Sequence, residues 1–161
     1  MKNKLIQLTI ILFSLAFATR VITVSATDRL YSMSLAVEEG AISPNKAITY
    51  LDYAIRLDST NADFYYQKYR VLSGLSPKGT VPDEERKVQK QQLHFLRHCI
   101  NLCPPWPRYH LNYALTLSKM SPRANLMTRE SILSELKKAS DLKPYSPLYQ
   151  RIYQARLNIY K

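Results

Sequence analysis

Three segments of the chain repeat one apolar spacing: a leucine, a small residue three positions later, and a second leucine three positions after that. The opening leucines are Leu51, Leu96 and Leu136. The small residues are Ala54, Cys99 and Ala139. The closing leucines are Leu57, Leu102 and Leu142. Spacings of three keep side chains on one face of an α-helix, and a small side chain lets two helices approach closely. We therefore expect a repeated helix-turn-helix unit with this face buried.

Composition and turn residues favour helices throughout. Only three of the 161 residues are glycine, and outside the N-terminal apolar segment no run alternates apolar and polar residues as a half-buried strand does. Prolines, glycines and capping residues divide the chain. The expected helices cover residues 28–39, 45–58, 62–74, 84–102, 108–120, 128–142 and 147–161. Thr27 and Asp28 are the predicted cap of the first helix, Gly40 is its predicted end, and residues 76–85 and 121–125 are predicted loops.

Residues 1–26 have the layout of an export segment. Two lysines precede an apolar run over residues 5–24. A basic start, an apolar middle and small residues at the end are typical of a signal peptide, and Ala18 and Ala26 end cleavage-like sites. The run is also about as long as a bilayer-spanning helix. Signal peptide and single transmembrane anchor both fit, and a buried helix of a cytosolic protein is the third alternative. Either of the first two places residues 27–161 outside the cytoplasm, in a periplasmic or other extracytoplasmic space, and an uncleaved segment would anchor them in the inner membrane.

The repeat resembles the tetratricopeptide repeat (TPR) family, whose signature combines an alanine and an aromatic four positions apart with a later proline. Ala47 and Leu51 stand at the first two positions, with leucine in place of the aromatic, and Ala114 occupies the small position of a first helix. Tyr69 and Gln92 depart from the pattern. The resemblance implies an all-α fold, a right-handed stack of antiparallel helix pairs forming a TPR-like α-solenoid. An irregular all-α bundle is the alternative.

The resemblance also implies an extended concave surface lined by the first helix of each pair, which in such proteins binds segments of other proteins. The residues expected to line it are Asp63, Tyr66, Gln67, Arg70, Arg108, Asn112, Gln150 and Arg151. The chain carries a net charge of +11, and the three arginines would give this surface a basic character. We therefore expect an extended or acidic protein segment as the partner. Ordinary solvated side chains are the alternative interpretation of each residue.

Residues 93–103 hold the densest group of chemically versatile side chains. His94 and His98 share a helix face, but Cys99 and Cys103 point elsewhere, so one helix cannot gather all four around a metal ion. A Cys99–Cys103 disulfide is a candidate in an oxidising compartment, and two reduced thiols are the alternative. No nucleophile–base arrangement and no glycine-rich phosphate loop is apparent. We predict no metal, no cofactor and no enzymatic activity.

These features predict an exported or membrane-anchored interaction module. The order of export segment, helix pair and the segment at residues 54–66 resembles the TPR regions attached to bacterial O-antigen ligase and polymerase-type proteins, which implies a role in cell-envelope or surface polysaccharide assembly. A module that binds polysaccharide or another anionic polymer is an alternative, because tyrosines stack on sugars and the chain is basic; buried tyrosines would favour the adaptor. A structural subunit of an envelope complex is another. Nucleic acid is excluded by the predicted compartment.

Overall fold

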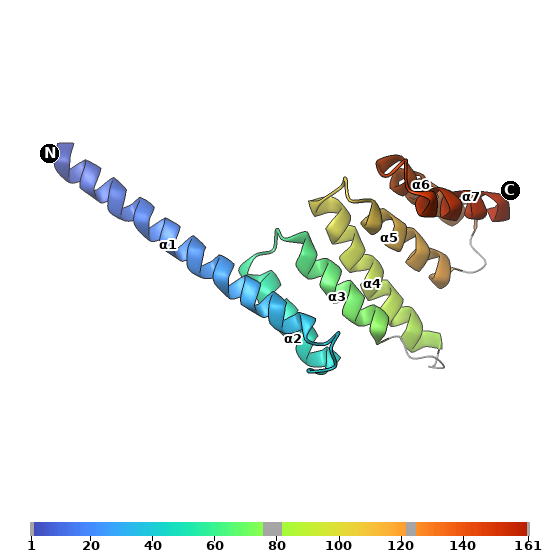
Figure 1. Ribbon diagram of the computed structural model, residues 1–161, viewed down its shortest axis with the longest axis horizontal. Coiled ribbons are helices and arrows are strands. Elements are labelled where there is room, and N and C mark those ends of the chain that lie inside the picture. Colours follow the sequence, from blue (N-terminus) through green and yellow to red (C-terminus); the bar gives the residue numbers. More distant parts are fainter. Residues whose placement is uncertain (1, 76–81, 122–124, 161) are drawn as a thin grey trace. The chain divides into compact units, whose positions relative to one another are not determined.

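The computed structural model describes residues 2–75, 82–121 and 125–160, and within these residues the chain forms seven α-helices and no strand (Figure 1). The helices are α1 (Lys2–Leu35), α2 (Pro44–Leu57), α3 (Ala62–Gly74), α4 (Pro82–Leu102), α5 (Pro107–Met120), α6 (Leu126–Leu142) and α7 (Pro147–Tyr160). The contacts between them divide the chain into two compact units, Met1–Thr60 and Asn61–Lys161. The all-α prediction is confirmed.

The first unit consists of α1 and α2, and its first helix differs from the prediction. A helix start at Thr27 is wrong, because α1 runs without a break from Lys2 to Leu35. The Thr27 hydroxyl donates to the Val24 carbonyl oxygen at 2.8 Å, inside the helix, and therefore caps nothing. Beyond Leu35 the chain turns through Gly40, whose φ of 73° lies in the left-handed region that glycine adopts readily. The predicted division at residue 26 thus falls inside a continuous helix.

The second helix of this unit begins as predicted. Ser43 caps α2, because its hydroxyl accepts from the Lys46 backbone N–H at 3.4 Å. Pro44 occupies the first helical turn, where its missing N–H costs no hydrogen bond. From there α2 packs back along α1.

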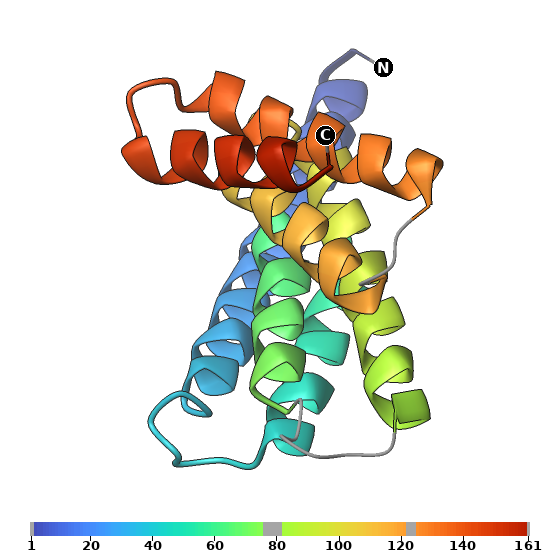
Figure 2. The ribbon, with the colours of Figure 1, turned by 90° about the vertical axis from the view of Figure 1, so that its right-hand side faces the viewer.

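In the second unit each helix packs against the next, from α3 with α4 to α6 with α7 (Figures 1 and 2). Prolines and asparagines set the helix bounds. Asn61 and Asn125 cap α3 and α6 through their side-chain oxygens, and Pro107 and Pro147 begin α5 and α7. α4 and α6 each begin two residues earlier than predicted. Residues 76–81 and 122–124 of the two predicted loops lie outside the described residues.

The small-residue positions of the repeat are the most completely buried sites. Ala54, Cys99 and Ala139 are all 0% exposed. The leucines before them are buried too, and so are the residues that stand for the family's alanine at positions 47, 92 and 132. The closing leucines differ from the prediction, because Leu57, Leu102 and Leu142 are exposed by 50%, 38% and 41%. Each of them is the last residue of its helix.

The volume at Ala139 provides a test of this packing. Ala139 belongs to the core cluster that Leu111, Ala114, Ile132, Leu136 and Tyr149 form between α5, α6 and α7. Ala139→Leu should lower the free energy of unfolding by about 1–3 kcal/mol, because an inserted side chain forces the helices apart. Ala155→Leu is the matched control, since Ala155 is exposed on α7 and should change stability by less than about 0.5 kcal/mol. Urea unfolding measures both. Equal effects would contradict close packing at Ala139.

Candidate functional site

Side chains of α3 and α5 meet on one face of the second unit. Asn112 donates from its side-chain nitrogen to the Tyr66 hydroxyl oxygen at 3.0 Å. The Tyr109 hydroxyl lies 3.5 Å from the Asp63 carboxylate oxygen, to which it donates. Both contacts join helices that follow one another as first helices of successive pairs. We call the residues of this surface the α3–α5 face: Asp63, Tyr66, Gln67, Arg70, Arg108, Tyr109 and Asn112.

Aromatic rings fill the space between these hydrogen bonds. The Tyr66 ring lies 5.2 Å from that of Tyr109 and 5.7 Å from that of Tyr69, centroid to centroid. The Trp106 ring lies 6.2 Å from that of Tyr109. Such distances are typical of favourable aromatic pairs. Tyr109, only 3% exposed, is the residue of this face that the sequence interpretation missed. Its position one helical turn before Asn112 was the available signal.

The charged side chains of the α3–α5 face interact with neighbouring polar groups. Arg70 donates to the Gln67 side-chain oxygen at 3.2 Å. Burial raises the pKa of the Tyr66 hydroxyl, although nearby Arg108 and the Asn112 hydrogen bond oppose this shift. Burial and the Asp63 carboxylate raise the pKa of Tyr109. Both phenols are therefore neutral at physiological pH, while Arg70 and Arg108 present exposed positive charge.

Six of the eight residues predicted to line a binding surface lie on α3 and α5, but Gln67 is only 1% exposed, so the prediction that it lines the surface is wrong. The other two, Gln150 and Arg151, lie in the first turn of α7, half-buried and exposed respectively. α7 packs against α6, so these two residues belong to the end of the repeat. Their participation in a binding surface stays a prediction.

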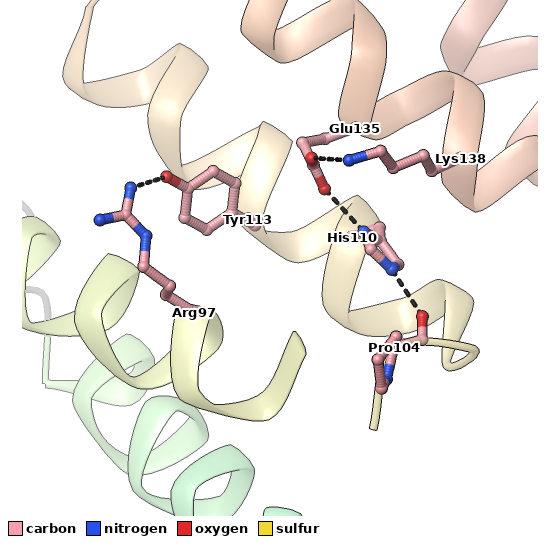
Figure 3. A network of polar contacts seen from close by, with 6 residues as sticks. All are labelled: Arg97, Pro104, His110, Tyr113, Glu135 and Lys138. Atoms are coloured by element: carbon pink, nitrogen blue, oxygen red, sulfur yellow. Dashed lines mark hydrogen bonds and ion pairs between the residues drawn. The ribbon is translucent and has the colours of Figure 1, made fainter. Parts of the chain in front are cut away.

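A second polar cluster, which the sequence interpretation did not identify, surrounds the buried imidazole of His110 (Figure 3). His110 Nδ1 lies 2.6 Å from a Glu135 carboxylate oxygen, and Nε2 lies 2.7 Å from the Pro104 carbonyl oxygen. Lys138 donates to the other Glu135 oxygen at 2.7 Å. Nearby, Arg97 donates to the Tyr113 hydroxyl at 2.9 Å, joining α4 to α5.

The partners of His110 indicate its role. A carbonyl oxygen only accepts hydrogen bonds, so Nε2 carries a hydrogen. Its Nδ1 faces the Glu135 carboxylate, so the ring bridges Pro104 and Glu135. Burial alone would raise the pKa of Glu135, but the hydrogen bonds from His110 and Lys138 outweigh it and hold that pKa below its usual value. The cluster therefore joins α5, α6 and the turn after α4.

His110 also forms part of the wall of an open surface pocket of about 710 Å³. The other residues around it are Ile100, Asn101, Pro104, Lys138, Asp141 and Leu142. Both nitrogens of the imidazole are already hydrogen-bonded within the protein. The histidine therefore fixes the shape of this pocket and has no ring nitrogen left to bind a ligand.

The cysteine–histidine segment of α4 is engaged in packing. Cys99 and Cys103 are both free thiols. The Cys99 thiol is buried 3.5 Å from the Ala62 carbonyl oxygen, and burial raises its pKa to about 12. His98 stacks on Tyr65 with ring centroids 5.1 Å apart. No group of three metal-binding side chains gathers within the described part of the chain. The disulfide stays a prediction for oxidising conditions.

Comparison with solved structures identifies the fold. The TPR domain of Arabidopsis OM64 superposes with a TM-score of 0.62 at 14% identity, over 83% of this chain and 96% of that one. The first TPR of Spaghetti (RPAP3), bound to HSP90 peptide SRMEEVD, has a TM-score of 0.61 at 10% identity, over 84% and 93%. The fold is that of tetratricopeptide repeats.

A third TPR-like neighbour comes from bacteria. The Yersinia enterocolitica type III secretion chaperone SycD, in complex with a peptide of the translocator YopD, has a TM-score of 0.57 at 13% identity, over 83% and 88%. No protein-family model matches the sequence, and no curated protein matches it either. The similarity of this chain to the solved structures is therefore a similarity of fold.

The Glu135 cluster predicts a pH dependence of stability. Glu135→Gln should lower the free energy of unfolding at pH 7 by about 1–3 kcal/mol, because it removes a carboxylate that is hydrogen-bonded to both His110 and Lys138. The folded-state pKa of Glu135 is lowered from an ordinary value of 4.5. Its contribution is therefore complete above that value and is lost as the pH falls through the folded-state pKa.

Urea unfolding across the acidic pH range measures this effect. The difference between wild type and Glu135→Gln should shrink as the solution is acidified. Glu130→Gln, an exposed site on the same helix, is the matched control and should behave like wild type. A difference that is constant with pH would show that the Glu135 carboxylate contributes nothing through its charge.

The burial of Cys99 predicts unequal thiol reactivity. In the folded protein at about pH 8, maleimide should modify Cys103 much faster than Cys99, because only the thiolate reacts and the pKa of Cys99 is raised. Single variants Cys99→Ala and Cys103→Ser, followed by mass spectrometry, assign the two rates. In urea the rates should converge. Equal rates in the folded protein would contradict the burial of Cys99.

Proposed function

We propose that this protein is a membrane-anchored interaction module that binds an extended acidic segment of a partner protein on its α3–α5 face. The observation that carries the proposal is the hydrogen-bonded junction of Tyr66 with Asn112 and of Tyr109 with Asp63. It fixes the relative position of two successive first helices, and Arg70 and Arg108 stand exposed beside it. A preorganised surface pays less conformational entropy when an extended chain binds.

The similar structures support a protein partner. RPAP3 is bound to an HSP90 peptide whose sequence, SRMEEVD, contains three acidic residues. SycD is in complex with a peptide of its translocator. The same fold in this chain, together with the exposed Arg70 and Arg108, favours an acidic segment, because arginine forms paired hydrogen bonds with carboxylates.

The tyrosines favour a protein partner over a polysaccharide. Sugar binding by stacking requires an open aromatic face. Tyr109 is buried, and Tyr66 is half-buried with its hydroxyl already bonded to Asn112. These rings therefore contribute more to the junction of α3 and α5 than they offer to a ligand.

The first unit supports membrane anchoring. Within the described residues, α1 is the helix long and apolar enough to cross a bilayer. It continues unbroken past Ala18 and Ala26 and then packs against α2. Removal of residues 1–26 would take away the part of α1 that lies beside the end of α2. We therefore propose a retained anchor, with the repeats on the extracytoplasmic side of the membrane. A link to polysaccharide assembly stays a prediction.

Charge reversal on the α3–α5 face tests the proposed binding. Arg70→Glu with Arg108→Glu should abolish recovery of a partner from detergent-solubilised membranes after chemical cross-linking, because the carboxylates of the bound segment would meet two negative charges. The matched control is Arg86→Glu with Lys90→Glu, the same charge change at two exposed sites on α4. Quantitative mass spectrometry of the captured proteins provides the measurement.

The control decides the interpretation. A protein captured by wild type and by the α4 control, but lost from the α3–α5 variant, supports the proposal. Capture should also weaken as salt rises, because exposed charge pairs are screened. A partner retained by the α3–α5 variant would move the interface elsewhere and contradict the proposal.

A further inference from the structure

α2 ends beside the stretch of α1 where the bare apolar part of that helix ends. From Ile6 to Ile22 the large apolar side chains of α1 are exposed, Phe13 by 75% and Ile22 by 68%. Further along, Thr27 and Ser34 are buried, and α2 runs back along this part of α1 (Figure 1). The bare part is mostly apolar, and its length lies at the short end of the range of about 17–25 residues that spans a bilayer.

The end of α2 and the middle of α1 form one surface pocket of about 500 Å³. It is lined by Leu57, Asp58 and Thr60 from the end of α2, and from α1 by Ala16, Thr19, Arg20, Thr23, Val24 and Thr27. Asp58 accepts from both the backbone N–H and the hydroxyl of Thr60, at 2.9 and 2.7 Å. These hydrogen bonds, with a smaller contribution from Arg20, hold the pKa of Asp58 below its usual value.

The ionised Asp58 and the nearby Arg20 indicate which part of the helix pair is in contact with water. Charged side chains are costly in the hydrocarbon of a bilayer and collect at its interface. If the bare part of α1 up to Thr19 lies in the hydrocarbon, Arg20 is at its end and extends its charge to the membrane surface, where Asp58 and the end of α2 then lie too.

The exposed side chains at the end of α2 suit that position. Tyr53 and Leu57 are exposed by 52% and 50%, and with Arg56 they share one helix face. The Arg56 guanidinium lies 5.8 Å from the centre of the Tyr53 ring. Tyrosine is enriched at membrane interfaces, and arginine extends its charge to the headgroups from an apolar stem.

We propose that the last turns of α2 rest in the headgroup region of a phospholipid bilayer, with Tyr53 and Leu57 in the interface and Arg20 and Arg56 directed to lipid phosphates. The inference rests on the proposed anchoring by α1 and goes beyond it, because it makes α2 a second membrane contact. The length of the bare apolar run and the complementary charge of phosphate and arginine both favour lipid over a protein partner at this surface. The first helix pair would then be held against the membrane instead of tilting freely on its anchor.

Depth-dependent fluorescence quenching tests this contact in the full-length protein. The protein is reconstituted in vesicles of phosphatidylcholine and phosphatidylglycerol whose acyl chains carry bromine either near the headgroup or near the bilayer centre. In a Trp106→Phe background, single tryptophans replace Phe13, Leu57 or Ile42. Ile42 is the matched aliphatic control, because it precedes the 14 residues of α2 and so lies about 20 Å from its end.

The three positions give separate outcomes. Quenching of the Phe13→Trp protein by deep bromines shows that α1 is inserted. We expect shallow bromines to quench the Leu57→Trp protein about twofold or more over Ile42→Trp, because only the end of α2 reaches the interface. Added Arg56→Glu should reduce the Leu57→Trp signal, whereas added Lys46→Glu, at the other end of α2, should not.

Failure of the inference can be separated from failure of the anchor. If Phe13→Trp is quenched while Leu57→Trp behaves like Ile42→Trp, the membrane contact of α2 is refuted and the anchor stands. If Phe13→Trp is not quenched, the anchoring itself fails and the inference fails with it. Far-UV circular dichroism of each variant establishes that the helices are retained.

Discussion

Close approach of helices at three small residues is the constraint on which the rest of the structure depends. Ala54, Cys99 and Ala139 are fully buried at equivalent positions of α2, α4 and α6. Where a side chain is that small, backbones come close enough for the leucine three positions earlier to be buried in the contact, as Leu51, Leu96 and Leu136 are. Cysteine serves at one position because it behaves as a small apolar residue. Its thiol is consequently a packing group, with a raised pKa and low expected reactivity.

α5 is the helix through which this packing reaches the candidate site. Tyr109 and Asn112 connect it to α3 through hydrogen bonds, while His110 connects it to α6 and to the turn after α4. The adjacent residues Tyr109 and His110 of α5 thus contact different helices, α3 and α6. The His110–Glu135 pair holds the same helix that contributes Tyr109 and Asn112 to the α3–α5 face, so this buried polar cluster contributes to the geometry of that face.

The sequence predicted the fold well because proline, glycine and capping asparagine act locally. The start of α5 at Pro107 and the end of α3 at Gly74 needed no tertiary information. The start predicted at Thr27 was wrong because a local cap competes with helix propagation, and the apolar helix before it continues with its hydrogen bonds intact. The His110 cluster was missed because its carboxylate partner lies 25 residues away. Such pairs depend on packing that a single sequence does not display.

Site-specific photo-crosslinking tests most directly whether the α3–α5 face is the binding surface. A photoreactive amino acid would replace Ser73, exposed on α3 one turn beyond Arg70, and Ser131, exposed on α6, in separate full-length proteins. The account predicts a cross-linked partner from position 73 and none from position 131 after irradiation in the native membrane. Cross-linking from position 131 alone would contradict it and assign the interface to α6.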